Sequence, residues 1–98
     1  FPGGKIEPGE LARDALAREL AEELGIAVSP QALAPLTFAV APLAADELLL
    51  LLFLCRDWQG QPQPLDASEI AWVALDALPA LAMPPADVVL ARQIAALV

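Results

Sequence analysis

The strongest constraint on this fold is an amphipathic helix pattern between Leu11 and Leu24. Apolar residues recur at helical spacing on one stripe, and Gly25 stands where a left-handed C-terminal cap belongs. The stripe is formed by Ala12, Leu16, Leu20 and Leu24, with Ala15 beside it. On another face, Glu19, Glu22 and Glu23 are spaced at i, i+3 and i+4, so their side chains project from neighbouring positions. The pattern predicts a helix that buries one face and gathers three carboxylates on the other.

The carboxylate cluster has two interpretations. Like charges at this spacing destabilise an exposed helix by roughly a few tenths of a kcal/mol per pair, so a bound cation would explain the arrangement. Carboxylates are hard oxygen ligands, and Mg²⁺ is typically held by one or two of them together with waters and substrate phosphates. The alternative is a solvated acidic face on which Arg13 and Arg18 form ordinary ion pairs. The helix pattern alone leaves both interpretations open.

The rest of the chain supplies loops, strands and a second helix. Residues 1–9 form a loop because prolines and two glycine sites interrupt regular backbone, and such glycines indicate special dihedrals or close approach to a ligand. The run 48–55 predicts a buried strand that is apolar on both faces, and it is far shorter than the roughly 20 residues of a membrane span. Further expected elements are strands at 36–40 and 70–75, a turn at 42–46, a polar loop at 56–65 and a closing helix at 86–97 whose apolar side carries Val89, Leu90, Ile94 and Leu97.

Length and charge restrict the classes of function. The chain has 98 residues, enough for one small domain. Its formal net charge of -8, without histidine, repels phosphate backbones, so direct binding to nucleic acid is not expected and a polyanionic substrate would need a bridging metal ion. Cys55 is the only cysteine, which excludes an intramolecular disulfide and a cysteine-based zinc site and fits a reducing, cytoplasmic setting.

One string of residues is far more specific than these patterns. The Nudix box, GX5EX7REUXEEXGU with U a bulky aliphatic residue, is matched at every position by Gly4-x5-Glu10-x7-Arg18-Glu19-Leu20-x-Glu22-Glu23-x-Gly25-Ile26. The chain therefore resembles the Nudix hydrolases, which cleave a nucleoside diphosphate linked to another group. The resemblance implies an α/β (α+β) fold, the Nudix α/β/α sandwich with a mixed β-sheet, as a single domain over 1–98. Because the first strands of that fold lie upstream of the FPGG segment, we expect an N-terminally incomplete and marginally stable domain.

The resemblance also implies roles for individual residues. Metal ligands are expected at Gly3, Glu19, Glu22 and Glu23, with Mg²⁺ or Mn²⁺ as the ion. Arg18 corresponds to the arginine that orients a glutamate, and Glu10 to a more structural, outer position. The metal would neutralise the diphosphate and lower the pKa of a bound water, whose proton passes to Glu23 or to a loop acid, Glu69 or Asp66.

The flanks of the box resemble the MutT branch of the family, whose members convert oxidised purine nucleoside triphosphates such as 8-oxo-dGTP to the monophosphate and pyrophosphate. The segments FPGGKIEPGE and RELAEELGI carry most of this resemblance. On this basis Phe1 is expected to line the nucleotide pocket, and Asp87 to contact the base in place of an asparagine. Each has a simpler explanation, since a large apolar residue often packs in a core and an acid in the first turn of a helix is favoured by the helix dipole. The acidic loop at 44–47 departs from the branch, which carries a basic residue there.

Two other functions remain open from the sequence. One is a Nudix hydrolase of another nucleotide, such as CTP, a methylated nucleotide or ADP-ribose. The other is a non-catalytic Nudix-like module that binds 8-oxoguanine. Such modules tolerate loss of box glutamates, whereas this chain retains them all, and its net charge opposes DNA binding. The chain is expected to act on a nucleoside triphosphate, without a membrane, as a cytoplasmic monomer or weak dimer.

Overall fold

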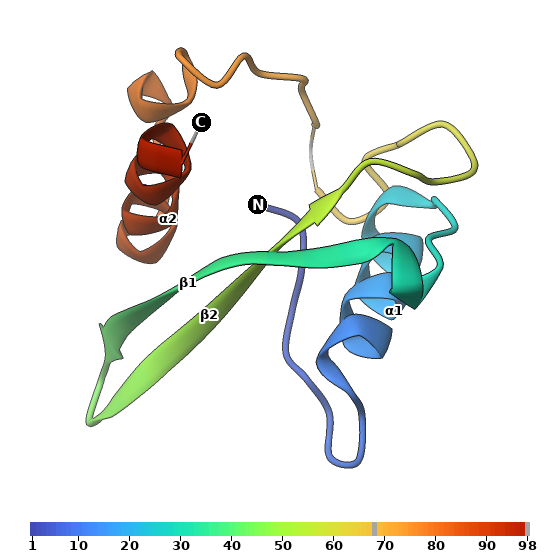
Figure 1. The fold of residues 1–98 in the computed structure, drawn as a ribbon, viewed down its shortest axis with the longest axis horizontal. Coiled ribbons are helices and arrows are strands. Elements are labelled where there is room, and N and C mark those ends of the chain that lie inside the picture. The colour runs from blue at the N-terminus through green and yellow to red at the C-terminus, as the bar shows by residue number, and fades with distance from the viewer. Residues whose placement is uncertain (68, 98) are drawn as a thin grey trace. The chain divides into compact units, whose positions relative to one another are not determined.

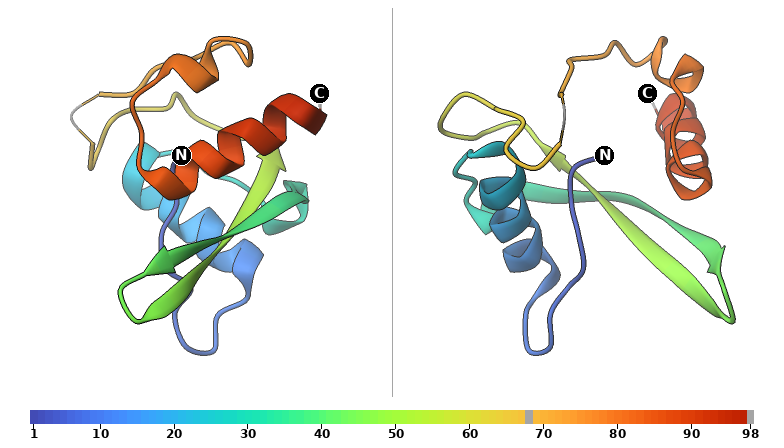
Figure 2. Two further views of the ribbon diagram at one scale, coloured as in Figure 1. Left: turned by 90° about the vertical axis from the view of Figure 1, so that its left-hand side faces the viewer. Right: turned by 180° about the vertical axis from the view of Figure 1, so that it is seen from behind.

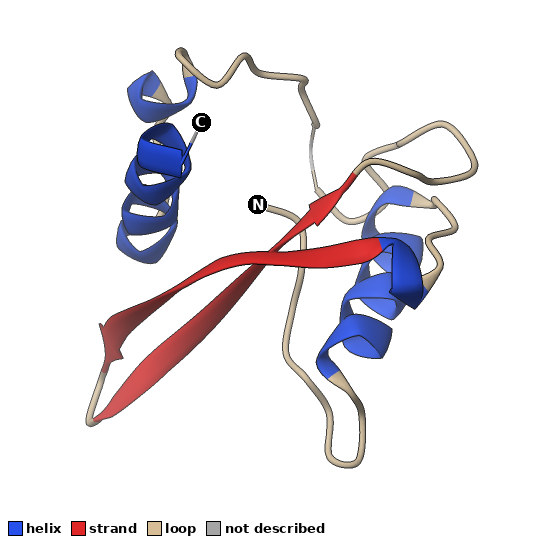
Figure 3. Cartoon of the chain, in the orientation of Figure 1, coloured by secondary structure: helices blue, strands red, loops and turns tan. Residues whose placement is uncertain are grey.

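The computed structural model describes residues 1–67 and 69–97, which form two helices, two strands and two short 3₁₀ helices (Figures 1 and 3). In chain order these are α1 (Ala12–Leu24), a 3₁₀ helix at Pro30–Ala32, β1 (Leu33–Leu43), β2 (Asp46–Cys55), a 3₁₀ helix at Leu78–Ala80 and α2 (Pro85–Leu97). The chain divides into two compact units. Unit 1 consists of Phe1–Ala34 and Leu54–Ala71, and unit 2 of Pro35–Phe53 and the chain from Trp72 onward.

Unit 1 contains α1 and its cap. The helix begins after Leu11, which has extended backbone and no side-chain cap, and it ends at Gly25, whose N–H donates to the carbonyl of Ala21 at 3.1 Å. Gly25 has a φ of 68°, a left-handed conformation that glycine adopts without steric cost. The predicted helix and its cap are confirmed. Of the predicted apolar stripe, Leu20 and the neighbouring Ala15 are buried, and the other members are half-buried.

The loops of unit 1 pack along this helix. Residues 1–10 run alongside α1 and then turn into it (Figure 2), which agrees with the predicted loop at 1–9. After α1 an antiparallel bridge pairs Ala27 with Gln59. The buried apolar residues of the unit are Ala15, Leu20, Ile26, Val28 and Leu33. The core of unit 1 therefore lies between α1 and the chain that follows it.

Unit 2 contains most of a β-hairpin together with α2. The strands β1 and β2 are neighbours in a two-stranded sheet and are joined by a turn at Ala44 and Ala45, within the predicted 42–46. Ala44 has a φ of 51°, and positive φ is typical of two-residue hairpin loops because their twist matches that of the strands. The buried residues of the unit are Ala39, Ala41, Leu90, Ala91 and Ile94. The Thr37 hydroxyl and Gln93 Oε1 are 2.7 Å apart, in a hydrogen bond that joins β1 to α2.

The apolar run 48–55 is a strand, as predicted, but the prediction that it is buried is wrong. None of the ten residues of β2, all of them described, is buried, and Leu49 and Leu51 are 58% and 45% exposed. On the neighbouring strand, Phe38 and Val40 are 60% and 51% exposed. The reason is that an antiparallel pair has neighbours on one edge of each strand only and keeps an exposed face wherever no further layer covers it.

The predicted strand at 70–75 is also wrong. The described backbone there is irregular and enters a turn at Leu75, because a strand needs a neighbour for its hydrogen bonds and the described sheet contains β1 and β2 only. The closing helix is confirmed as α2, although Val89 and Leu97, predicted on its apolar side, are 37% and 56% exposed. The α+β class is confirmed, with an antiparallel pair in the described residues where a mixed sheet was expected. No helix in this part of the chain has the length and apolar character needed to cross a membrane.

Candidate active site

Arg18 is the centre of a charged network on α1. Its guanidinium donates two hydrogen bonds to Glu10, from Nε at 2.9 Å and from Nη2 at 3.0 Å, so the pair is bidentate. Nη1 donates to Glu19 Oε1 at 2.8 Å and, at a longer 3.4 Å, to Glu22 Oε2. Nη2 also donates to the carbonyl oxygen of Lys5 at 3.1 Å. One arginine therefore joins the loop before α1 to the helix face that carries the glutamates.

The contact between Arg18 and Glu10 keeps both of these groups ionised. Hydrogen bonds from Arg18, and then one from the backbone N–H of Glu7, lower the pKa of Glu10 to about 2. Hydrogen bonds to Glu10 and Glu19 in turn raise the pKa of Arg18 above its ordinary value. Glu10 is therefore a carboxylate at neutral pH. Its bidentate contact fixes the plane of the guanidinium, so that Nη1 points in a defined direction toward Glu19.

The glycine pair lets the first loop approach α1 closely. The N–H of Gly3 donates to Glu23 Oε2 at 3.0 Å. A Cβ atom at Gly4 would lie 2.5 Å from the carboxylate of Glu19, which is closer than nonbonded atoms approach, so a larger residue would displace that side chain. The sequence predicted special dihedrals or a close approach at this loop. The structure shows a close approach, and the groups approached are carboxylates of α1.

The three glutamates predicted to bind metal lie on one face of α1, but they do not meet at one point. In residues 1–67 and 69–97, no three Asp, Glu, His or Cys side chains form a group that could hold a metal ion as they lie. The predicted convergence is therefore not seen. The physical reason is that the carboxylates are held by two different donors. Glu19 and Glu22 both accept hydrogen bonds from Arg18, whereas Glu23 accepts one from the backbone N–H of Gly3.

The chemistry of the donor set nevertheless fits a divalent cation. Each of these three carboxylates has a second oxygen that accepts no hydrogen bond from the described residues. Oxygen ligands from one helix face suit Mg²⁺. The Glu22 side chain is 59% exposed and that of Glu19 is 16% exposed, so the helix offers both an open and a sheltered ligand. The residues present suit a hard divalent ion in kind, although their rotamers do not close around one.

The loop that carries the predicted acids leaves from the C-terminal end of α1. The N–H of Leu65 donates to the carbonyl of Glu23 at 3.0 Å. Asp66 and Glu69 follow in this loop and are both exposed. Within the part of the chain that the structure describes, Glu69 makes no hydrogen bond or ion pair with Glu23. The catalytic role of the loop acid stays a prediction.

The two residues predicted to bind the substrate, Phe1 as part of the pocket lining and Asp87 as a contact to the base, belong to different units. Phe1, in unit 1, is 47% exposed rather than packed in a core. Asp87, in unit 2, lies in the first turn of α2, as predicted, and its N–H donates to the carbonyl of Pro84 at 3.0 Å. Their roles toward a nucleotide stay predictions.

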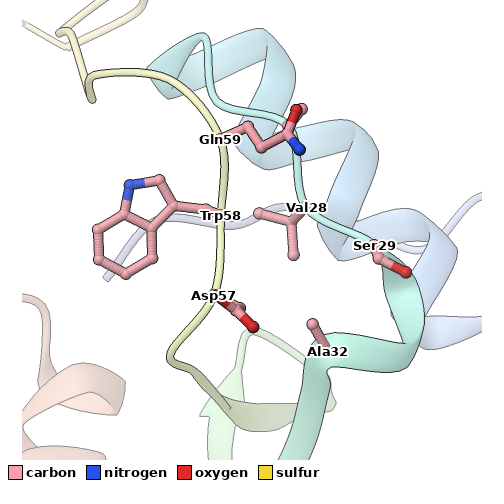
Figure 4. Close-up of a pocket in the computed structure, with 7 residues that line it drawn as sticks. Val28, Ser29, Ala32, Asp57, Trp58 and Gln59 are labelled. Atoms are coloured by element: carbon pink, nitrogen blue, oxygen red, sulfur yellow. The ribbon is translucent and has the colours of Figure 1, made fainter.

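A pocket that the sequence analysis missed lies beside the bridge between Ala27 and Gln59 (Figure 4). It has a volume of about 500 Å³ and is lined by Ala27, Val28, Ser29, Ala32, Asp57, Trp58 and Gln59. Asp57 and Gln59 project to one side of their segment and Trp58 to the other, as in an extended strand. No α1 glutamate lines this pocket. In the sequence, this segment is marked only by Trp58 and by Gly60 two residues later. These residues do not reveal which other segment they face.

Comparison with known proteins assigns the sequence pattern to a family. The family model described as NUDIX domain matches residues 1–94. The 8-oxo-dGTP diphosphatase of Escherichia coli (strain K12) is 36% identical over 87 residues, which cover 89% of this chain and 66% of that protein. The 8-oxo-dGTP diphosphatase of Haemophilus influenzae is 35% identical over 88 residues, which cover 89% of this chain and 62% of that protein. The chain thus spans somewhat less than two thirds of the length of these relatives.

Solved structures share the fold. The solution structure of the E. coli ORF135 protein has a TM-score of 0.90 and 30% identity, and the match covers 99% of this chain and 68% of that one. A MutT structure from work on Aliivibrio salmonicida and Vibrio cholerae has a TM-score of 0.78 and 31% identity, with 100% of this chain and 74% of that one covered. These matches confirm the fold class that the resemblance implied.

Proposed function

This chain belongs to the Nudix family, and on that premise we propose that it is a metal-dependent nucleoside triphosphate pyrophosphohydrolase. The proposed substrates are oxidised purine nucleotides such as 8-oxo-dGTP, and the products are the monophosphate and pyrophosphate. Support comes from the similarity to two proteins named 8-oxo-dGTP diphosphatase over 89% of this chain.

The observation that carries the proposal is the contact between the glycine loop and the glutamates of α1. An ordinary ion pair would need only Arg18 and Glu10. Here the same arginine also holds Glu19, and Gly4 leaves no room for a side chain beside that carboxylate. A solvated acidic face gives no reason to exclude a Cβ atom at this position. A site that needs the Glu19 carboxylate in one place gives such a reason.

The proposed roles follow from these contacts. Glu19, Glu22, Glu23 and the backbone of Gly3 hold the metal, which supplies charge neutralisation for the phosphate groups when bound. Arg18 fixes the Glu19 carboxylate through its 2.8 Å hydrogen bond. Glu23 or a loop acid, Glu69 or Asp66, accepts the proton of the attacking water.

Asp87 is proposed to contact the nucleotide base, and Phe1 to line the nucleotide pocket. A carboxylate accepts hydrogen bonds from the N–H groups of a purine, so Asp87 suits a base edge that presents donors. We expect Asp87→Ala to lower the ratio of kcat/KM for 8-oxo-dGTP to that for dGTP. If this ratio is unchanged, the role given to Asp87 is wrong.

Product analysis with Mg²⁺ tests the proposed function. We expect pyrophosphate release from 8-oxo-dGTP with a higher kcat/KM than from dGTP, and no release in EDTA. Faster turnover of CTP, or phosphate-sugar products from ADP-ribose, would assign the chain to another Nudix substrate. Binding of the oxidised nucleotide without any turnover would instead identify a non-catalytic binding module.

A further inference from the structure

A second set of backbone hydrogen bonds lies at the C-terminal end of α1, where residues 59–65 run against residues 23–27. We call this contact the C-terminal seam. Its bonds are Ala27 N–H to Gln59 O and Gln59 N–H to Ala27 O at 2.9 Å each, Gln63 N–H to Leu24 O at 2.9 Å, and Leu65 N–H to Glu23 O at 3.0 Å. The loop is yellow in Figure 1 and lies at the end of the helix. The seam therefore attaches a distant segment to the helix turn that carries Glu23.

Two glycines allow the segments of the seam to come this close. A Cβ atom on Gly25 would lie 3.1 Å from Leu65 Cδ1, and Gly25 already has a left-handed φ of 68°. Gly60 has a φ of 100°, and a Cβ atom there would lie 3.4 Å from the carbonyl oxygen of Gly25. A side chain at Gly25 would crowd that of Leu65, whereas at Gly60 a Cβ atom would make ordinary contact and the cost would come from the left-handed backbone.

The seam does more than cap the helix. The last carbonyls of any helix lack partners within it, and the N–H groups of Gln63 and Leu65 bind two of them. However, α1 already has its own cap, because the Gly25 N–H donates to Ala21. The additional bonds therefore fix the position of the loop relative to α1.

We propose that the C-terminal seam positions the loop acid against the glutamate face of α1, with Leu65 as the positioning residue. This inference rests on the proposed function. Asp66 follows Leu65 directly and Glu69 is four residues along, so an extended chain from Leu65 reaches at most about 14 Å. Without the Leu65 bond the last attachment would be Gln63 and the reach to Glu69 about 21 Å, and with Gln63 detached as well it would be about 35 Å from Gln59. The seam confines the acid to a much smaller volume beside Glu23, which raises the fraction of time that it spends in a reactive orientation.

Proline substitution tests this role because it deletes single N–H donors. The N–H of Leu65 is shared between Glu23 O at 3.0 Å and Gln63 O at 2.9 Å. Leu65→Pro removes both bonds and keeps every glutamate in the sequence, whereas Leu65→Ala keeps the N–H. A matched control is Gln61→Pro, at an exposed residue of the same loop whose N–H binds no described group. We expect Leu65→Pro to lower kcat about tenfold or more, with KM and the Mg²⁺ requirement within about twofold of the wild type and a smaller loss in both controls.

Double-mutant cycles separate positioning from a general loss of structure. One of the two loop acids, Glu69 or Asp66, takes the proton. If the seam acts through that acid, adding Leu65→Pro to its amide variant (Glu69→Gln or Asp66→Asn) does not lower kcat any further. Multiplicative losses with both acid variants would overturn the proposal. Should Leu65→Pro fail to fold, Gln63→Pro removes the neighbouring bond and enters the same cycles.

Hydrogen exchange gives a measurement that does not depend on activity. We expect the amides of Gln63 and Leu65 to be protected in the full chain, and rapid exchange at both would overturn the seam itself. Protected amides in a protein that releases no pyrophosphate would reject the proposed function, and the positioning role with it. The amides could also be protected in an active protein in which the losses of kcat from Leu65→Pro and from each acid variant multiply. That result would reject the positioning role alone.

Discussion

Unit 1 and unit 2 are stabilised by different kinds of contact. In unit 1, hydrogen bonds join segments that are distant in the sequence, as in the contacts of Arg18 with Glu10 and of Leu65 with Glu23. Unit 2 is a hairpin and a helix joined by the hydrogen bond between Thr37 and Gln93, and its other buried side chains are aliphatic: Ala39, Ala41, Leu90, Ala91 and Ile94. Its hairpin exposes Phe38, Val40, Leu49 and Leu51.

This difference indicates where single substitutions will affect chemistry. A hydrogen-bond network depends on the position of individual atoms, so one displaced group disturbs its neighbours. An exposed apolar surface has no such geometry to lose, and substitutions there change association more than function. We therefore expect substitutions in the hydrogen-bond network of unit 1 to change kcat, and substitutions on the exposed hairpin of unit 2, away from Asp87, to leave it unchanged.

The largest expected effect is that of Glu23→Gln in unit 1. The amide keeps the size of the side chain and can still accept the N–H of Gly3, but it loses the charge proposed to act on the metal or on the attacking water. We expect kcat to fall by about 100-fold or more, with the helix signal in circular dichroism unchanged. The matched control in unit 2 is Glu47→Gln, at an exposed residue of β2, which should retain wild-type kcat. Equal activity of the two variants would remove the functional distinction between the units.

Gly4→Ala is expected to have the next largest effect. Its Cβ atom would lie 2.5 Å from the carboxylate of Glu19, so that side chain must leave its contact with Arg18. We expect a fall of about tenfold or more in kcat, because small displacements of positioning groups are costly in rate. Gly9→Ala is the control: a Cβ atom there meets nothing within 4 Å, although its φ of 79° adds backbone strain. In the control, Gly9→Ala, stability should fall while kcat stays at the wild-type value. A loss of kcat in Gly9→Ala but not in Gly4→Ala would contradict the proposed close approach.

The parts of this structure that depend on local rules could be predicted from the sequence. The spacing of apolar residues and Gly25 predicted α1 and its end, and the closing helix was found in the same way. The burial of β2 and the strand at 70–75 were mispredicted because both depend on neighbouring strands, which periodicity within one segment does not report. The hydrophobicity of Leu49 is the same whether or not another layer covers it.

The candidate site was predictable to a similar extent. The fixed spacing of the box identified the glutamates and Arg18, because side-chain type carries that information. It did not show that Arg18 holds Glu10 with two bonds, or that Arg18 binds Glu19 and Glu22 while Glu23 binds the backbone of Gly3. The C-terminal seam was missed altogether, because it is made by the backbone N–H groups of Gln63 and Leu65, which every residue except proline possesses.

Unit 2 provides the third prediction, in which association changes and catalysis does not. Leu49→Lys places a charge on the exposed face of the hairpin, where Leu49 is 58% exposed. Charges on exposed strands oppose edge-to-edge pairing, so we expect less self-association in light scattering and a stability change within about 0.5 kcal/mol. The kcat value should match the wild type. A large loss of activity would show that this face of unit 2 contributes to the site after all.

The smallest expected effect comes from Glu10, the member of the unit 1 network that lies outside the proposed metal ligands. Its pKa is lowered from 4.5 to about 2, chiefly by the hydrogen bonds from Arg18. A carboxyl with a depressed pKa stabilises the folded state fully above its unfolded value and loses that contribution as the pH falls through its folded value. Wild-type stability should therefore decline between about pH 4.5 and pH 2 in part through this group.

Glu10→Gln tests this titration because the amide has no proton to gain. The variant should be less stable than the wild type at pH 7, and the difference should shrink as the pH is lowered from 4.5 toward 2. Urea unfolding across this range measures it, with Glu47→Gln of β2 as the unit 2 control. The effect should also weaken in salt, since the pair is partly open to solvent and exposed ion pairs are screened. A constant difference between variant and wild type from pH 7 to pH 2 would mean that Glu10 acts through packing, and that unit 1 owes less to its charges than the hydrogen bonds of Arg18 indicate.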